Sequence, residues 1–392
     1  SSGGNDGPDK DNSSGGGGSY QFSMSTQNMN LCGLTSEYTN YEVIAYGDDG
    51  GIISRHQPNI SGQVQATFEQ SHVNLAIVRD TGTDTSDKKE LDVTVLAHYP
   101  IGDLGTLTLR TNDTEGCQCQ TATISILPGD LTTQKLNLPH SLSSFSNATS
   151  QFNNTQLCEV QEGVEALLVA NHLDTGSSDI YYRTIANTSQ LLTDGALSID
   201  MLTTGQVGRA ITINTEDYVF RTHQINYVTD QIYNYSVPDS NDNSDNSINV
   251  LDHARVEKIE FYASEQLGTL GHSIPVGFWD VYVPVTDDTT DITYSKPEFE
   301  PDLLNDLLDD PTSAYNLDGA QQRVVTGYVE FSRPDDTTDE WFYILPSQSD
   351  SGVNFELPAE YLDGLAEDSQ YQDLTSYSYW RLNEIPAIGS LD

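Results

Sequence analysis

The amino-acid sequence predicts a mainly β protein made of two β-sandwich domains. Short runs in which apolar and polar residues alternate recur along the chain, and turn-rich segments separate them at intervals of roughly 10 to 20 residues. The runs are rich in Val, Ile, Thr and Tyr, with 21 tyrosines in 392 residues. These residue types fit the pleated, half-buried face of a strand. The pattern therefore favours sheets that each bury one face.

The predicted strands begin after residue 20. The alternating runs cover residues 63–68, 73–78, 91–98, 105–110, 121–127, 164–170, 180–185, 210–213, 256–263, 278–285, 324–331 and 340–345. Residues 256–262 (VEKIEFY) resemble the opening strand of bacterial immunoglobulin-like domains. This resemblance implies sandwiches of the immunoglobulin-like kind.

Helical signals are few and lie near the C-terminus. Pro301 precedes leucines at helical spacing in residues 303–308, and residues 358–365 form a second candidate. Proline is favoured in the first turn of a helix, and apolar residues three and four apart share one helix face. We therefore expect a few short helices in the second domain.

The domain division follows the polar segments. Residues 1–19 (SSGGNDGPDKDNSSGGGGS) contain no apolar anchor and predict a disordered or extended tether. A first sandwich domain is expected over 20–237, a polar linker over 238–252, and a second β-rich domain over 253–392. The first segment resembles the linker behind the lipid-modified cysteine of haloarchaeal lipoproteins, which implies a lipid tether ahead of Ser1. The alternative is a secreted protein without a lipid.

Charge is the dominant feature of the composition. The chain has 59 acidic and 16 basic residues, a formal net charge of −43, and the acids lie along its whole length. Such a surface repels itself in dilute buffer, whereas a Debye length of about 3 Å in molar salt removes most of that penalty. The pattern resembles proteins of extremely halophilic archaea and implies that a high cation concentration is required. The alternative is an ordinary acidic secreted protein.

The same charge excludes two classes of partner. A nucleic acid needs a basic patch to neutralise its phosphates, and anionic lipid headgroups attract basic segments. The sequence also has no apolar run near the roughly 20 residues that a membrane-spanning helix needs. Attachment to a membrane is therefore expected only through an N-terminal lipid.

Four cysteines, an even number, predict disulfides and an extracellular location. They are Cys32, Cys117, Cys119 and Cys158. Cys117 and Cys119 are too close in sequence to pair easily with each other, so each is expected to reach Cys32 or Cys158. That arrangement would tie residues 32–158 into one unit. A zinc site is the alternative, although the usual C-x-x-C spacing is absent, and free thiols are the other.

Residues 241–252 (NDNSDNSINVLD) follow the ligand spacing of calcium loops of the EF-hand and dockerin kind. The oxygen-bearing positions are Asn241, Asn243, Asp245, Ser247, Asn249 and Asp252. Asn241 stands where such loops usually have aspartate, and Asn246 where they have glycine. Calcium is thus the one cofactor that the sequence predicts, and a plain polar linker is the alternative.

One sequence resembles the catalytic loop of pepsin-like aspartic peptidases. It is Asp174-Thr175-Gly176, with a similar Asp80-Thr81-Gly82 and a further Asp350. The chemistry needs two carboxylates that share a proton, one from each lobe. The spacing leaves no room for equivalent lobes, and motifs of the H-E-x-x-H, G-x-S-x-G and P-loop kinds are absent. We therefore predict no catalytic site.

Seven sequons mark candidate glycosylation sites of an exported chain. They are Asn12, Asn59, Asn112, Asn147, Asn153, Asn187 and Asn234.

These observations predict a non-enzymatic extracellular surface protein of a halophilic archaeon or its virus, structural or adhesive, which associates with itself or with other surface proteins. An unpaired segment such as Tyr20–Met29 could build filaments by completing the sheet of a neighbour. The alternative is a lipid-tethered protein that binds a solute or glycan at Trp279, Trp341 or Trp380. Those tryptophans could equally be core residues.

Overall fold

The computed structural model describes the chain in segments. These are residues 18–82, 89–127, 133–138, 140, 144–147, 151–160, 166–171, 180–185, 195–200, 206–207, 209–215, 225–228, 232–235, 247–250, 255–256, 259–265, 276–281, 291–294, 315–316, 323–346, 348–349, 355–365 and 371–384. The described part is mainly β, which confirms the predicted class. Its helical content is two turns of 3-10 helix, η1 (Ala359–Leu362) and η2 (Tyr371–Leu374). The prediction for residues 358–365 corresponds to η1, whereas residues 303–308 lie outside the described segments.

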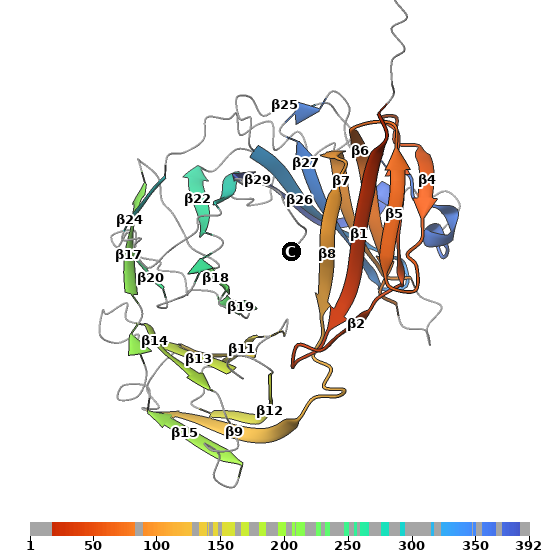
Figure 1. The fold of residues 1–392 in the computed structure, drawn as a ribbon. Coiled ribbons are helices and arrows are strands. Elements are labelled where there is room, and N and C mark those ends of the chain that lie inside the picture. The colour runs from red at the N-terminus through yellow and green to blue at the C-terminus, as the bar shows by residue number, and fades with distance from the viewer. Residues whose placement is uncertain are drawn as a thin grey trace, which may run out of the picture.

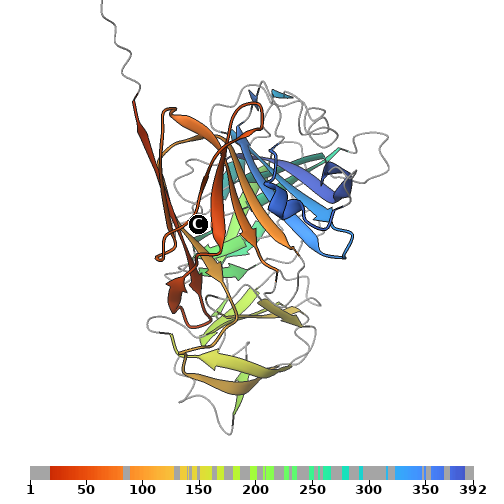
Figure 2. The same ribbon diagram turned by 90° about the vertical axis from the view of Figure 1, so that its right-hand side faces the viewer.

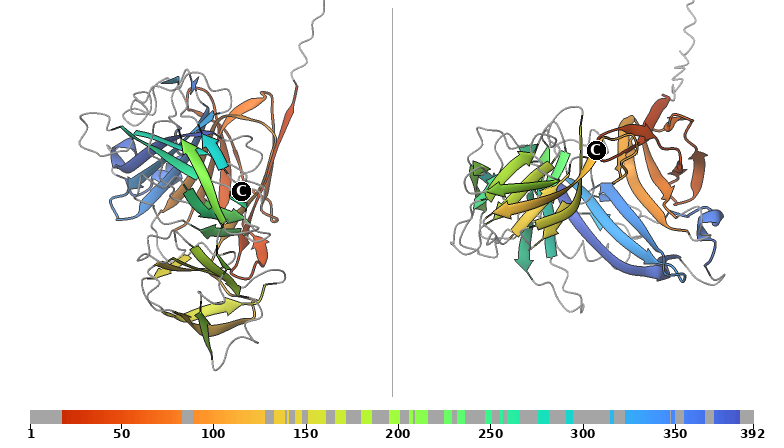
Figure 3. Two further views of the ribbon diagram at one scale, coloured as in Figure 1. Left: turned by 90° about the vertical axis from the view of Figure 1, so that its left-hand side faces the viewer. Right: turned by 90° about the horizontal axis from the view of Figure 1, so that it is seen from below.

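A nine-stranded sheet combines strands from the N-terminal part of the chain with strands from its C-terminal part. In spatial order its strands are β22 (Ile259–Glu265), β23 (Val276–Val281), β29 (Thr375–Glu384), β26 (Arg323–Ser332), β27 (Thr338–Pro346), β7 (Leu91–Pro100), β6 (His72–Asp80), β3 (Tyr41–Tyr46) and β4 (Ile52–His56). The join is the parallel pair β27–β7, in which Glu340 lies opposite Asp92 and Ile344 opposite Leu96. Figure 3 shows the blue C-terminal strands continuing the sheet of orange N-terminal strands.

This sheet takes strands from both sides of residues 238–252. The sequence places a domain boundary there, yet β3, β4, β6 and β7 from one side share the ladder with β22, β23, β26, β27 and β29 from the other. Alternation in a single strand says which face is buried but not which strand lies beside it. The parallel partner of β7 comes from more than 200 residues further along the chain, and no local signal marks that pairing.

A second sheet packs on one face of the first to form a sandwich. It contains β1 (Tyr20–Met29), β2 (Thr35–Glu37), β5 (Gln63–Phe68) and β8 (Asp103–Arg110). Phe22 and Met24 point inward from β1 and pack with Val43, Leu75 and Leu96 of the larger sheet. Figure 2 shows the red and orange strands of this sandwich, the blue C-terminal strands beside them, and the yellow-green strands below.

The opposite face of the nine-stranded sheet is covered by side chains from residues 355–365 and 371–374. Phe355 stacks on Tyr46 with ring centroids 4.5 Å apart, and Tyr371 packs on Phe331 at the same separation. Trp341, 3% exposed, lies in this core. The sheet is therefore buried on both faces at β3 and β6, whereas β27 exposes Glu340 and Phe342.

A third core belongs to the middle of the chain. It lies between the sheet of β12 (Gln151–Cys158), β9 (Cys119–Leu127) and β15 (Ala196–Asp200) and the sheet of β11 (Ser144–Asn147), β10 (Thr133–Asn137), β13 (Ala166–Asn171), β14 (Ile180–Ile185) and β16 (Gln206–Val207). Ile124, Leu136 and Phe152 are among its buried residues. Shorter sheets complete the described part: β20 (Ser247–Val250) with β17 (Arg209–Thr215) and β24 (Asp291–Tyr294); β19 (Ile232–Tyr235) with β18 (Ile225–Val228) and β21 (Arg255–Val256); and β25 (Tyr315–Asn316) with β28 (Gln348–Ser349).

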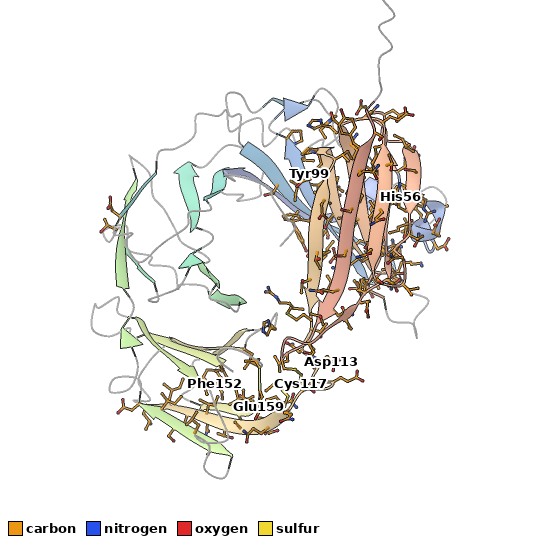
Figure 4. The ribbon with its side chains drawn as sticks, viewed as in Figure 1. His56, Tyr99, Asp113, Cys117, Phe152 and Glu159 are labelled. Atoms are coloured by element: carbon orange, nitrogen blue, oxygen red, sulfur yellow. A yellow bond between two sulfur atoms is a disulfide. The ribbon has the colours of Figure 1, made fainter. Side chains whose placement is uncertain are left out.

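Two disulfides fix the passage from the sandwich to this third core. They pair Cys32 with Cys117 and Cys119 with Cys158. Figure 4 shows Asp113 and Cys117 where the chain leaves β8 for β9. The backbone N–H of Leu31 donates to the carbonyl of Asp113 at 2.9 Å, which adds a direct bond across the passage. Cys117 and Cys119 are thus each bonded to one of the two cysteines expected for them, Cys32 and Cys158. Among the residues that the structure describes, no helix is both long enough and apolar enough to cross a membrane.

Candidate interaction surface

The segment Tyr20–Met29 is a central strand of its own sheet. On one side β1 pairs antiparallel with β5, where Gln21 lies opposite Thr67. On the other side it pairs in parallel with β8, where Ser25 lies opposite Thr106. The prediction that this segment is unpaired and free to enter a neighbour is therefore wrong. Its alternate apolar residues require a buried face, and the chain supplies that face itself.

The outward side of this sheet carries uncharged polar residues at its centre, and we name this central part the polar face. Figure 1 shows β8, β1 and β5 side by side. Because β1 and β5 bury every second residue, the remaining positions point outward. The polar face consists of Gln21, Ser23, Ser25 and Gln27 on β1, Gln63, Gln65 and Thr67 on β5, and Thr106 and Thr108 on β8.

Hydrogen bonds between side chains connect the strands across the polar face. The hydroxyls of Ser25 and Thr106 lie 2.7 Å apart, and the amide of Gln27 donates to the Thr108 hydroxyl at 3.1 Å. The Thr67 hydroxyl donates to Gln21 Oε1 at 3.0 Å. Side chains that are already ordered lose less conformational entropy when a partner covers them. The polar face is thus arranged in fixed rows.

Charged groups lie at the margin of the polar face. Asp103 is at the start of β8, and Glu37 of β2 lies opposite Gln27. The Asp103 carboxylate accepts the N–H of Gly105 at 2.9 Å, and this bond lowers the pKa of Asp103. The nine-stranded sheet differs, because Asp92, Glu340 and Glu330 lie in register across three of its strands. The chain therefore places carboxylates on one sheet surface and omits them from the centre of another.

The surface next to the polar face is also poor in acidic residues, from β5 to β4. Residues 50–68 contain no aspartate or glutamate. Ile53 is 64% exposed on β4 and Ile60 is 94% exposed in the loop before β5. The rings of His56 and Phe68 meet edge to face and bring the two strands together. Exposed isoleucines thus lie beside a sheet face without charge.

A buried ion pair fixes the segment that covers the other side of the molecule. Arg333 donates to Asp339 at 2.8 Å and to the carbonyl of Tyr361 at 2.6 Å. Asp339 also accepts the Tyr371 hydroxyl and, at 2.8 Å, the backbone N–H of Leu91 on β7. Burial raises the pKa of Tyr371, and the neighbouring Asp339 adds to the rise. The group is fully bonded and joins the N-terminal and C-terminal strands.

A second buried carboxylate holds the same segment at β4. Glu42, 1% exposed, accepts two bonds from Arg55, at 2.9 and 2.6 Å, and one from the Tyr361 hydroxyl at 2.5 Å. Arg55 also binds Glu360 at 2.5 Å, and this bond lowers the pKa of Glu360. Burial, with Glu42 as the next cause, raises the pKa of Tyr361. These contacts are structural ties between η1 and the sheet.

Of the three peptidase-like aspartates, the structure describes Asp80 alone. Asp80 ends β6, and its carboxylate accepts the N–H of Gly82 at 3.0 Å and Lys89 Nζ at 3.2 Å. These bonds connect the end of β6 with residues 82 and 89. Asp174 and Asp350 lie outside the described residues.

The calcium loop lies mostly outside the described residues. Ser247 and Asn249 are in β20, opposite Thr212 and Ala210 of β17. The other four proposed ligands, Asn241, Asn243, Asp245 and Asp252, are not among the described residues. The described residues hold no group of three or more metal-binding side chains. The calcium site stays a prediction.

The predicted glycosylation sites lie partly within the described residues. Asn59, Asn112 and Asn153 are exposed, Asn147 and Asn234 lie in β11 and β19, and Asn12 and Asn187 are outside the described residues.

Among the three tryptophans, Trp341 is a core residue in contact with Phe331 and Tyr371. Trp279 and Trp380 lie in β23 and β29.

The sequence predicts strands at residues 63–68 and 105–110, but their outward side chains were not predicted to form a functional surface. The available signal was the combination of Gln, Ser and Thr at every second position with the absence of acids, in a chain where acids are otherwise frequent. That signal becomes visible only when β1, β5 and β8 are placed next to one another.

The sequence matches no family model and no curated protein. Among solved structures, the Bacillus anthracis TIE protein aligns with 6% identity and a TM-score of 0.16 over 70% of this chain and 50% of that one. Two B repeat units of the collagen binding protein of Staphylococcus aureus align with 8% identity and a TM-score of 0.13, over 95% of this chain and 94% of theirs. At such TM-scores these similarities carry no argument about fold or function.

Proposed function

We propose that this chain is an extracellular structural or adhesive surface protein of a halophilic archaeon or its virus, and that it works through protein–protein contact rather than catalysis. The observation that carries the proposal is the polar face, a carboxylate-free surface on a chain with a net charge of −43. This surface differs from the row of carboxylates on the nine-stranded sheet and is suited to be covered by a partner.

Two further features support this function. Disulfides form and persist in oxidising compartments, and both bonds here close the passage between two cores. The acidic surface suits molar salt, where charge repulsion is screened over about 3 Å. Both features fit a protein exposed outside the cell, and membrane attachment would come from a lipid ahead of Ser1.

The partners are other copies of the chain or other surface proteins. Strand addition through Tyr20–Met29 is no longer part of the proposal, because β1 is engaged on both sides. The solute- or glycan-binding alternative loses Trp341 as a ligand contact, since this side chain is 3% exposed.

Negative-stain electron microscopy of the native protein at about 3 M salt, with size-exclusion chromatography and light scattering, tests the proposal under conditions that screen charge. Discrete oligomers or regular arrays would support a structural role. A monomer at every concentration, whose melting temperature rises with a small solute or glycan, would overturn it in favour of a binding protein.

A further inference from the structure

We propose that Asn59 carries an N-linked oligosaccharide, which covers the exposed loop between β4 and β5. Seven asparagines stand in N-x-[ST] sequences, and such a sequence is an acceptor where an exported chain presents it at the surface. The inference therefore rests on the proposed function, because export brings the chain to the transferase. It goes further by selecting one acceptor and the side chain that its oligosaccharide covers.

Exposure separates Asn59 from Asn153. The acceptor sequence consists of the asparagine and the hydroxyl residue two positions later, so the transferase has to reach both. Asn59 and its hydroxyl residue, Ser61, are both exposed. Asn153 is exposed as well, but its hydroxyl residue, Thr155, is only 7% exposed on β12. The folded chain thus presents the complete acceptor at Asn59 and half of it at Asn153.

Asn112 lies in the passage that the disulfides close. Its hydroxyl residue, Thr114, is half-buried, and the carbonyl of Thr114 accepts the backbone N–H of Cys117 at 3.0 Å. The carbonyl of Asp113 accepts the backbone N–H of Leu31 at 2.9 Å. The transferase would have to reach Asn112 within a segment that is bonded to its neighbours on either side of the acceptor. Asn59 is therefore the better presented of the two.

The loop holds the side chain of Asn59 by its oxygen. Asn59 Oδ1 accepts the backbone N–H of Ser61 at 2.9 Å and that of Gln63 at 3.0 Å. Because the amide nitrogen donates and does not accept, these two bonds identify which end of the amide faces the loop. Among the described residues, none accepts a bond from Asn59 Nδ2. The atom that would receive the sugar is thus the end of the amide that the loop does not use.

Gly62 fixes the loop to the sandwich. Its φ is +73°, and a Cβ at this position would lie 2.6 Å from the carbonyl oxygen of Thr26, so the close approach requires glycine. The carbonyl of Gly62 accepts the backbone N–H of Thr26 at 3.0 Å and the Tyr41 hydroxyl at 2.6 Å. The Gly62 N–H donates to the carbonyl of Asn59 at 3.0 Å. The exposed acceptor is therefore held in a defined position beside β1 and β3.

The modification is a glycosyl transfer, and its co-reactant is a lipid-linked oligosaccharide phosphate. The bond between the anomeric carbon of the sugar and the phosphate oxygen breaks, and the oxygen keeps the electron pair. Asn59 Nδ2 forms a new bond to that carbon and loses one proton. The products are the glycosylated chain and the lipid phosphate, and a transferase of the exporting cell catalyses the step.

The oligosaccharide covers an apolar side chain at the tip of the loop. Ile60 is 94% exposed, more than any other large apolar side chain in the described part of the chain. Residues 50–68 contain no aspartate or glutamate, so charge repulsion does not protect this surface. A bulky, hydrated group on the preceding residue keeps other molecules away from Ile60. The acid-free loop thus gains solubility from sugar where the rest of the molecule gains it from carboxylates.

Mass spectrometry of the protein from the cell surface or medium of a halophilic archaeal host tests the proposal. Cleavage after Arg55 and Arg79 releases residues 56–79, in which Asn59 is the only sequon, and residues 111–135 contain Asn112 alone. We expect residues 56–79 to carry sugar in the parent and in Ser61→Thr but not in Ser61→Ala, because the hydroxyl is required. Residues 111–135 should carry less. The host's own surface glycoprotein, measured in the same cells, shows that the transferase is active.

The outcomes separate this inference from the proposed function. A protein at the cell surface with unmodified residues 56–79, beside a glycosylated host protein, would overturn the inference and leave the extracellular role in place. A protein found only inside the cells, without sugar, would overturn both.

A second measurement tests the covering of Ile60. We expect Ser61→Ala to lower the protein concentration at which self-association begins at about 3 M NaCl by at least about threefold, because the apolar side chain is then bare and charge is screened. Adding Ile60→Ser to this variant should restore the behaviour of the parent, and Ser61→Thr should match the parent throughout. Sedimentation velocity measures the association. A Ser61→Ala protein that associates no more than the parent would overturn the covering role.

Discussion

At the scale of single residues, the buried Arg333–Asp339 pair decides how the C-terminal segment is held. Both side chains are almost completely buried, and each is bonded to groups from other elements. A buried ion pair adds little stability in comparison with an apolar pair, but removing one partner leaves an uncompensated charge. A substitution at either residue therefore tests the contact between the N-terminal and C-terminal strands.

We expect Asp339→Asn to lower the free energy of unfolding by about 3–5 kcal/mol, because Arg333 keeps its charge in a buried site. Urea unfolding at high salt measures the change. The exposed Asp336 lies in the same turn, and Asp336→Asn is the control, expected within about 0.5 kcal/mol of the parent. A loss below about 1 kcal/mol for Asp339→Asn would contradict the buried pair.

Tyr46 offers a second test at this scale. Its hydroxyl is buried and has no hydrogen-bond partner among the described residues. An unpaired buried hydroxyl costs about 1–3 kcal/mol, so we expect Tyr46→Phe to keep or raise stability at pH 8. Thermal unfolding of the variant beside the parent measures this, and destabilisation by more than about 1 kcal/mol would mean that the hydroxyl has a partner.

Buried tyrosines also limit the stability of the folded protein at alkaline pH. Burial raises the pKa of Tyr46, Tyr343 and Tyr371 above that of a free tyrosine. Below about pH 10 both states keep these phenols protonated, and their contribution to stability is complete. Above about pH 10 the unfolded chain ionises first, so stability falls by up to about 1.4 kcal/mol per pH unit for each group. Melting temperatures from pH 8 to 11.5 at high salt should therefore decline from about pH 10, and a flat profile would contradict this assignment.

At the scale of elements, β1 shows why a strand cannot be assigned to a neighbour from its sequence. Its alternation of Phe22, Met24 and Thr26 with polar residues requires a buried face, and that requirement is met equally by its own sheet or by another copy. The structure supplies β5 and β8 as partners.

We expect an excess of a synthetic peptide with the sequence of residues 20–29 to leave the oligomeric state and the melting temperature unchanged, because β1 already fills its own place. Size-exclusion chromatography with a labelled peptide measures this, and a scrambled peptide is the control. Stable incorporation of the peptide with release of β1 would restore strand exchange as the mode of assembly.

The disulfides act at the same scale. The Cys32–Cys117 bond closes a loop with a sequence separation of 85 residues. Long loops lose much chain entropy on closure, so we expect Cys32→Ser with Cys117→Ser to lower the free energy of unfolding by about 2–5 kcal/mol. Urea unfolding measures the loss, and a parent that is equally stable with and without reductant would contradict it.

The sequence predicted individual strands better than it predicted which strands lie side by side. Residues 63–68 were assigned as a strand with the bounds observed for β5, because the period of two is a local property. The polar face depends on which strands lie together, and the pairing of β1 with β8 is not encoded by either strand alone. Disulfides were predictable because cysteine spacing is explicit, whereas the ion pair at Arg333 depends on tertiary contacts with β7 and residues 361–363.

At the scale of the whole molecule, charge couples stability to salt. With a net charge of −43, the folded state concentrates repulsion that the unfolded chain relieves. The Debye length grows from about 3 Å at 1 M salt to about 10 Å at 0.1 M. We therefore expect the melting temperature to fall steadily as NaCl is lowered over this range. Scanning calorimetry measures the trend, with sucrose at matched osmolality as the control, and a melting temperature independent of salt would contradict it.

The parallel pair of β7 and β27 has a consequence for the order of folding. Leu91 and Asp339, whose bond lies at this join, are 248 residues apart in sequence. As the chain is synthesised, one side of β7 stays without its neighbour until most of the polypeptide has been made. Contacts between such distant segments form slowly. The nine-stranded sheet is therefore completed late, and β7 keeps an open edge until β27 has been made.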